Sequence, residues 1–282
     1  MGHKYDAISV KHLGKKSDYI DRYDASLLQP ISRDIGRKSI SAFGSAIPFF
    51  DGFDLWTGFE ISWLNTKGKP VVGIAEFRIP AKSKNLIESK SFKLYLNSLN
   101  QSNFDSAEQL QSILTADLSE AAQGNVSVSL FAGLTDYCRK ISDLSGICID
   151  DLDIQIDDYG FNPALLQDAV TENSHFVREE LSSNLLKSNC LVTMQPDWGS
   201  VLIKYEGRKI DREKLLRYII SFRQHNEFHE QCVERIFSDI KNLCQPEKLT
   251  VFARYTRRGG LDINPFRSDY ETDSDMGRLI RQ

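Results

Sequence analysis

The sequence predicts an α+β protein built from two related modules, in which antiparallel strands carry helices on one face. Two observations support this prediction. Aromatic and β-branched runs that flank short turns predict hairpins, and each hairpin is followed by two stretches with apolar residues at helical spacing. The same order of elements occurs twice along the 282 residues, which is the pattern of an internal duplication.

The first half of the chain predicts a hairpin, two helices and a further strand. Residues 55–65 and 71–79 are the hairpin strands, because the turn-forming sequence TKGKP separates them. Residues 88–100 and 106–122 are the two helices. The alternating sequence VSVSLFAG, residues 126–133, then predicts the last strand of the first module.

The second half repeats this order. Strands are expected within residues 191–207 on either side of a turn, helices at 211–225 and 229–243, and a strand at 249–256. Individual residues repeat as well, at a constant offset of 123: Tyr95, Ser98, Gln101 and Asn103 match Tyr218, Ser221, Gln224 and Asn226. Asp117 matches Asp239 at an offset of 122. A duplicated unit of this kind is an α+β layer whose helices cover one face of a sheet.

Residues 134–181 are the predicted connector between an N-terminal module, residues 1–133, and a C-terminal module, residues 182–282. Within the connector, apolar residues alternate with acidic ones over residues 147–158, so the carboxylates share one face of a predicted strand. A solvated strand face explains this period of two better than a metal site, since the glycine-turned spacing of an EF-hand is missing. We therefore expect no bound metal.

Composition limits the class of protein. With 41% hydrophobic and 26% charged residues, the chain can form one large domain or two ordinary domains without disulfides. A net charge of −4 argues against binding to long nucleic acids. No run approaches the roughly 18 apolar residues of a membrane span or the apolar core of a signal peptide, so we expect a cytosolic protein.

The five cysteines lack the paired spacing of a zinc site, which predicts reduced thiols. Cys232 and Cys244 lie on a predicted helix, and we expect both in the core.

The segment KSNCLVTMQPDWG, residues 187–199, holds a candidate catalytic pair. Cys190 follows small polar residues and lies on no amphipathic stripe, and Asp197 comes seven positions later, beyond a proline. A nucleophilic cysteine acts as its thiolate and needs a nearby group that transfers protons. Asp197 supplies that group if the chain folds back on itself. The alternative is a cysteine that is merely buried at the start of a strand.

Three other polar regions allow both a functional and a structural interpretation. Residues 225–230 lie where one predicted helix ends and the next begins, so they cap helix ends, or Glu230 accepts two hydrogen bonds from a guanine-like ring. Residues 88–93 and 257–260 are basic and either bind phosphate or form solvated surface. No G-x-G-x-x-G follows a strand, so a Rossmann dinucleotide site is not indicated.

Four segments together resemble the long, two-module form of 7-cyano-7-deazaguanine reductase: ESKSFKLYLNS, SNCLVTMQPDWGS, FRQHNEFHEQCVE and RYTRRGGLDINP. The resemblance covers nearly the whole chain. It implies tandem tunnelling-fold modules and NADPH-dependent reduction of the nitrile of 7-cyano-7-deazaguanine to 7-aminomethyl-7-deazaguanine, a step toward the tRNA base queuosine. It also implies a homodimer that takes a small-molecule substrate, without direct contact to nucleic acid or membrane.

The resemblance also implies roles for residues at matching positions. Cys190 looks like the cysteine that forms a thioimide, and Asp197 looks like its proton donor. Substrate contacts fall on Ile87, Glu88, Ser89, His229 and Glu230. NADPH contacts fall on Ser89, Lys90, Arg258 and Gly259. Two alternatives stay open, namely a cysteine-dependent nitrile or amidine hydrolase and a non-catalytic purine- or pterin-binding protein of the same fold.

Overall fold

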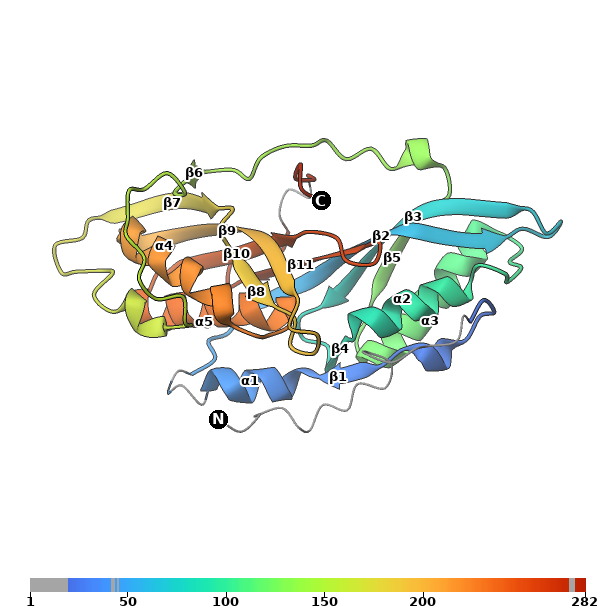
Figure 1. Ribbon diagram of the computed structural model, residues 1–282, viewed down its shortest axis with the longest axis horizontal. Coiled ribbons are helices and arrows are strands. Elements are labelled where there is room, and N and C mark those ends of the chain that lie inside the picture. Colours follow the sequence, from blue (N-terminus) through green and yellow to red (C-terminus); the bar gives the residue numbers. More distant parts are fainter. Residues whose placement is uncertain (1–19, 42–43, 45, 274–276) are drawn as a thin grey trace. The chain divides into compact units, whose positions relative to one another are not determined.

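The computed structural model describes residues 20–41, 44, 46–273 and 277–282, and it contains two compact units (Figure 1). Unit 1 consists of the described residues up to Arg33, together with Trp56–Cys138 and Arg258–Leu261. Unit 2 consists of the described residues within Asp34–Leu55, Arg139–Arg257 and Asp262–Gln282. In each unit helices lie along one face of antiparallel strands, so the predicted α+β class is confirmed.

Unit 1 contains the predicted hairpin and the predicted helices. Strands β2 (Asp51–Leu64) and β3 (Pro70–Pro80) are joined by a turn in which the Asn65 side chain accepts hydrogen bonds from two backbone amides. Helices α2 (Ser89–Ser98) and α3 (Ala107–Ala122) follow. Strand β5 (Ser127–Phe131) pairs with β3, so the strand order is β5-β3-β2.

Aromatic side chains form the centre of unit 1. The Phe92 ring on α2 lies 4.9 Å from the Phe77 ring on β3 and 5.2 Å from the Trp56 ring on β2, measured between centroids. These contacts fix the helix on the sheet, because buried aromatic pairs contribute both apolar area and a preferred geometry. A second, two-stranded sheet pairs β1 (Pro30–Ser32) with β4 (Asn85–Ile87) and was not predicted.

Unit 2 repeats the order of elements. Strands β7 (Phe176–Ser183) and β9 (Pro196–Arg208) precede helices α4 (Arg212–Ser221) and α5 (His229–Cys244), and β10 (Lys248–Tyr255) follows. The strand order β10-β9-β7 matches the order β5-β3-β2 in unit 1. In each unit the strand after the helices, β10 or β5, pairs with the strand before them, β9 or β3, and that strand pairs with the earlier one, β7 or β2.

Three further strands belong mainly to unit 2. Strand β11 (Leu261–Ser268) pairs with the free side of β10, and the two-residue strand β6 (Ile147–Cys148) runs parallel to β7. Strand β8 (Lys187–Asn189) pairs with the start of β9. Helix α1 (Arg33–Ser41) precedes the sheet in the chain.

Matching residues of the two halves make matching contacts. The Tyr95 hydroxyl donates a hydrogen bond of 2.6 Å to Asp117, and the Tyr218 hydroxyl donates one of 2.7 Å to Asp239. The hydroxyls of Ser98 and Ser221 each donate to the carbonyl oxygen of the tyrosine three residues earlier, at 2.6 and 2.7 Å. The predicted duplication is therefore confirmed at the level of elements and of side-chain contacts.

Two predicted strands are wrong. Residues 191–195 form a turn, and the strand that pairs with β9 on the side away from β10 is β7, which lies partly in the segment assigned to the connector. Residues 149–160 form no strand, although Ile154 is half-buried and its neighbours Asp153 and Gln155 are exposed. An extended segment that lies against a surface has the same period of two as a strand, so the pattern does not distinguish them. The module boundaries at residues 133 and 181 stay predictions.

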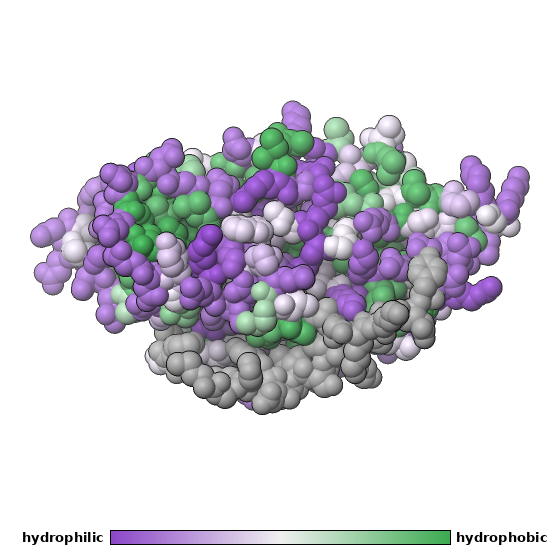
Figure 2. All heavy atoms as spheres, viewed as in Figure 1, coloured by the Kyte–Doolittle hydropathy of each residue, from purple (hydrophilic) through white to green (hydrophobic). Residues whose placement is uncertain are grey.

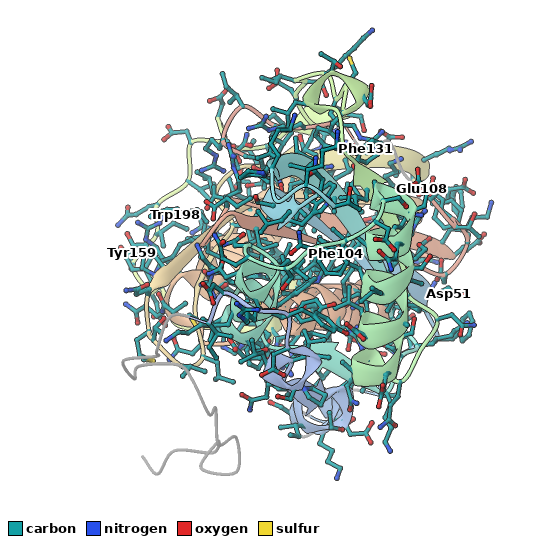
Figure 3. The ribbon with its side chains drawn as sticks, turned by 90° about the vertical axis from the view of Figure 1, so that its right-hand side faces the viewer. Asp51, Phe104, Glu108, Phe131, Tyr159 and Trp198 are labelled. Atoms are coloured by element: carbon teal, nitrogen blue, oxygen red, sulfur yellow. The ribbon has the colours of Figure 1, made fainter. Side chains whose placement is uncertain are left out.

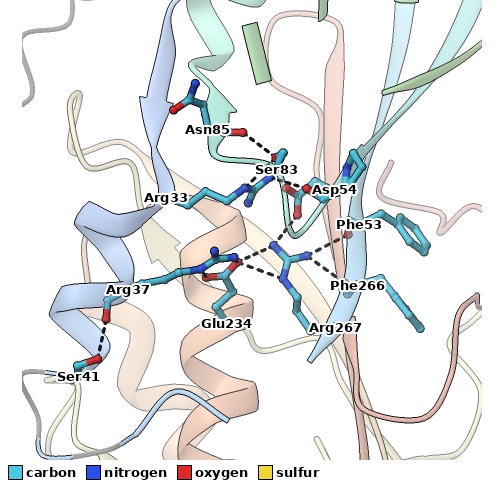
Figure 4. A network of polar contacts seen from close by, with 11 residues as sticks. Arg33, Arg37, Ser41, Phe53, Asp54, Ser83, Asn85, Glu234, Phe266 and Arg267 are labelled. Atoms are coloured by element: carbon cyan, nitrogen blue, oxygen red, sulfur yellow. Dashed lines mark hydrogen bonds and ion pairs between the residues drawn. The ribbon is translucent and has the colours of Figure 1, made fainter. Parts of the chain in front are cut away.

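Unit 2 contains a buried network of charged side chains around Arg267 (Figure 4). Its guanidinium lies 2.8 Å from the Asp54 carboxylate and 3.0 Å from the Glu234 carboxylate, and Arg37 also pairs with Glu234 at 2.9 Å. Arg267 has no exposed surface. A charge in such a position is tolerated only when it is paired and hydrogen-bonded.

The surface in Figure 2 is mostly hydrophilic. Among the described residues, every helix is too short or too polar to span a bilayer.

Candidate active site

The chain reverses direction between Cys190 and Asp197. Strands β8 and β9 are antiparallel, with Ser188 opposite Asp197 in the register. The Cys190 amide donates to the Gln195 carbonyl oxygen at 2.8 Å, and the Met194 amide donates to the Cys190 carbonyl oxygen at 3.0 Å. Cys190 is therefore held at one end of a tight turn, and Asp197 lies in the strand that leaves its other end.

Both side chains are nearly buried, at 4% exposure for Cys190 and 6% for Asp197. Met194, which has a left-handed φ of 60°, and Trp198 are exposed, and Trp198 lies at the periphery in Figure 3.

Helix α5 begins beside this turn. Its first residue, His229, lies with Nε2 3.3 Å from the Asp197 Oδ2 atom. The His229 ring stacks on Tyr255, the last residue of β10, with centroids 3.9 Å apart and planes 14° apart. Glu230 follows in the first turn of α5 and is 3% exposed. A buried carboxylate at this end of a helix is favoured by the helix dipole.

Polar backbone groups connect the turn to the residues before α5. The Asn189 amide donates to the His225 carbonyl oxygen at 2.8 Å, and the Glu227 amide donates to the Asn189 carbonyl oxygen at 3.2 Å. Because Cys190 directly follows Asn189, unit 2 brings all four predicted residues of its half to one region: Cys190, Asp197, His229 and Glu230.

Two other cysteines of unit 2, Cys232 and Cys244, are buried. Burial raises the pKa of the Cys232 thiol well above its usual range and raises the pKa of the Cys244 thiol to about 12. Both thiols therefore stay protonated near neutral pH, and the thiolate is the reactive form. Their predicted place in the core is confirmed.

The remaining predicted substrate residues lie at the start of α2 in unit 1. The Glu88 carboxylate caps this helix, since it accepts hydrogen bonds from the Lys90 amide at 2.9 Å and the Ser91 amide at 2.8 Å. Glu88 and Ile87 are buried, at 1% exposure each, and Ser89 is the first residue of the helix. Glu88 thus has a structural role that the sequence did not reveal, because glutamate is not a preferred N-cap residue.

The two basic clusters of the sequence meet in unit 1. Gly259 and Gly260 form the turn before β11, with φ of 59° and 79°, a conformation that favours glycine. A Cβ atom on Gly259 would lie 2.7 Å from Cδ of Lys93 on α2, so the turn and the helix are in contact. Lys90 lies in the first turn of α2, and Arg258 directly precedes the glycines. Guanidinium and ammonium groups are the side chains that pair with phosphates.

The structure also shows site-related residues that the sequence did not single out. Tyr255 supports His229 by stacking, and Arg235 forms an ion pair with Glu227. The sequence indicates only that Tyr255 lies in a strand and Arg235 in a helix, because neither contact is local. Glu227 belongs to the polar junction at residues 225–230, but nothing in the sequence indicates that it is buried.

These features define an α+β protein whose candidate site combines a buried cysteine with a carboxylate and a histidine, and whose other unit carries a basic cluster. Residues 19–130 match the family model described as nitrile reductase, 7-cyano-7-deazaguanine reductase, N-terminal. Residues 196–274 match the model described as QueF-like protein. The chain therefore belongs to the 7-cyano-7-deazaguanine reductase family, whose members are nitrile reductases of queuosine biosynthesis that act on a small deazaguanine.

The first match includes the start of α2, and the second includes Asp197, His229 and Glu230 but begins after Cys190.

Proposed function

We propose that this protein reduces the nitrile of 7-cyano-7-deazaguanine to 7-aminomethyl-7-deazaguanine with NADPH, through a thioimide on Cys190. The observation that carries the proposal is the reversal between β8 and β9, which holds the buried Cys190 and Asp197 at the two sides of one tight turn. A tandem tunnelling fold, a homodimer and a cytoplasmic location are parts of the same proposal. So is the absence of direct contact with nucleic acid or membrane.

The residues of this chain perform the covalent step. The Cys190 thiolate adds to the nitrile carbon, a π-electron pair moves to nitrogen, and Asp197 gives that nitrogen a proton. The product is a thioimide on Cys190. NADPH held by Ser89, Lys90, Arg258 and Gly259 would supply the hydride for this carbon. The carbon–sulfur bond then breaks, its electron pair returns to Cys190, and the imine that remains is reduced to the amine by a second hydride equivalent. Two protons and two NADPH are consumed for each nitrile.

Binding is assigned to residues outside the Cys190 turn. Glu230 accepts hydrogen bonds from the ring N–H groups of the substrate, and His229 stands beside Asp197 at the reacting end. In unit 1, substrate contacts are assigned to Ile87, Glu88 and Ser89, as the family resemblance implies. Ser89, Lys90, Arg258 and Gly259 bind NADPH, supported by the contact between the Gly259 turn and α2.

Two alternative functions would use some of the same residues. A hydrolase would form the same thioimide and let water complete the reaction, but it has no use for a basic cluster that fits phosphates. A purine- or pterin-binding protein would use Glu230 alone. Ultraviolet absorption of the protein mixed with 7-cyano-7-deazaguanine, without NADPH, tests the covalent step. We expect a new thioimide band, whereas binding alone gives no new band.

Replacing Glu230 by glutamine is expected to weaken nitrile binding at least about tenfold. Charge-assisted hydrogen bonds contribute about 1.5 to 3 kcal/mol each, and about 1.4 kcal/mol is a factor of ten. Glutamine loses the charge and turns an N–H group toward the donors of the ring. Calorimetry measures the change, with the exposed Glu213→Gln on α4 as the control. If Glu230→Gln binds the nitrile with the affinity of the parent protein, Glu230 does not bind substrate and only stabilises the start of α5.

Removing the charge of Lys90 or Arg258 is expected to raise the Michaelis constant for NADPH about tenfold and to leave nitrile binding nearly unchanged. The reason is the loss of one charge-assisted hydrogen bond to phosphate. Added salt should weaken NADPH binding in the parent protein. Lys69→Ala, in the exposed turn between β2 and β3, is the control. An unchanged constant in both variants would assign these residues to solvated surface.

A further inference from the structure

A buried ion pair lies next to the candidate active site in unit 2. The Glu227 carboxylate accepts hydrogen bonds from Nε of Arg235 at 2.9 Å and from Nη2 at 2.5 Å, and it also contacts Nε2 of His225 at 3.0 Å. The exposure of Glu227 is 0% and that of Arg235 is 1%. Burial alone would raise the pKa of Glu227, but the hydrogen bonds from Arg235 outweigh it and lower this pKa. The carboxylate is therefore ionised.

The backbone around Glu227 connects the two groups of site residues. Its amide donates to the Asn189 carbonyl oxygen at 3.2 Å, and the Asn189 amide donates to the His225 carbonyl oxygen at 2.8 Å. Cys190 is the next residue after Asn189. His229 and Glu230 follow Glu227 in the chain by two and three residues. The nucleophile and the proposed substrate-binding residues are thus joined through one short segment.

Arg235 is itself held from several sides within unit 2. Its guanidinium lies over the Phe161 ring, 5.2 Å from the centroid, and its Nη2 donates to the Ser39 hydroxyl at 3.2 Å. The Phe161 ring also contacts the His225 ring, with centroids 4.7 Å apart. The ion pair therefore ties the segment at residues 225–227 to the body of α5, and two parallel hydrogen bonds fix its orientation.

We propose that Glu227, held by Arg235, is a positioning residue that sets the place of Cys190 relative to His229 and Glu230. The inference rests on the proposed function, because it concerns the distance between the nucleophile and the bound nitrile. A shift of the reacting atoms by about 1 Å can slow a reaction on the order of 10²-fold. Glu227 touches neither substrate nor cofactor in this role.

The test measures the rate of thioimide formation by ultraviolet absorption without NADPH, in Glu227→Gln and in Arg235→Lys. Glutamine keeps the shape but loses the charge, and lysine keeps the charge but loses the paired hydrogen bonds. We expect both variants to form the adduct more slowly than the parent protein. For Glu227→Gln the rate of adduct formation should fall by up to about 10²-fold. NADPH binding, measured by titration, should not change, because its proposed residues belong to unit 1.

Glu179→Gln is the matched control. Glu179 pairs with Arg212 and accepts a hydrogen bond from Tyr205 at 2.7 Å, so the same substitution breaks a similar pair elsewhere in unit 2. We expect parental adduct formation in this variant. Parental rates in Glu227→Gln and Arg235→Lys would overturn the inference, and so would equal slowing in Glu179→Gln at an equal loss of melting temperature. A parent protein that forms no adduct overturns the proposed function itself, which distinguishes the two failures.

Discussion

Cys190→Ala is expected to abolish both turnover and the thioimide band while the protein stays folded. The substitution removes the sulfur that attacks the nitrile, and a nitrile without covalent activation resists hydride addition. The fold should survive, because the turn is held by backbone hydrogen bonds between Cys190, Met194 and Gln195 that alanine also forms. Circular dichroism checks that the variant is folded, NADPH oxidation checks turnover, and ultraviolet absorption checks the thioimide band.

Cys232→Ala provides the control for the Cys190 variant. Its thiol is buried in the core and its pKa is raised, so its loss should cost about 1 kcal/mol of stability and leave the covalent step intact. Substantial turnover in Cys190→Ala, with normal turnover in Cys232→Ala, would rule out the covalent mechanism.

Asp197→Asn is expected to slow thioimide formation by about 10² to 10⁴-fold with little change in nitrile affinity. An amide has nearly the shape of the carboxyl group but cannot transfer a proton to the nitrile nitrogen, and general acid catalysis contributes about this factor. The contact at 3.3 Å with His229 can be kept by the amide, so the neighbouring binding residues should stay in place.

Stopped-flow absorption follows the adduct in Asp197→Asn, and calorimetry follows nitrile binding. Adduct formation at the parental rate would assign proton transfer to another group. Loss of binding together with loss of rate would instead make Asp197 a substrate contact.

Most helices and strands were predictable because each buries one face, so its apolar residues recur at a regular spacing in the sequence. The α3 stripe is an example, since Leu110, Leu114 and Leu118 are fully buried at helical spacing. Strand β11 was missed for the opposite reason. Every residue of β11 is buried, yet it contains the polar residues Asp262, Asn264 and Arg267. Asn264 donates hydrogen bonds to Asp262 and to the distant Leu55 carbonyl oxygen, and Arg267 pairs with the distant Asp54. Paired charges in a core break the pattern on which such a prediction depends.

The same reasoning separates the predictable part of the site from the rest. The reversal that brings Cys190 and Asp197 to one turn was predictable, because both lie in one short segment with a proline between them. The stacking of Tyr255 on His229 and the pairing of Glu227 with Arg235 arise only when strands and helices pack together. The family resemblance implied the substrate and NADPH, which periodicity alone could not indicate.

Oxidation of NADPH in the presence of 7-cyano-7-deazaguanine, with product analysis, tests the central claim most directly. The account predicts that NADPH is consumed only when the nitrile is present, with two NADPH oxidised for each 7-aminomethyl-7-deazaguanine formed. Release of an amide or acid without NADPH oxidation would contradict it in favour of hydrolysis. Binding of the nitrile with neither oxidation nor a new product would contradict it in favour of a binding protein.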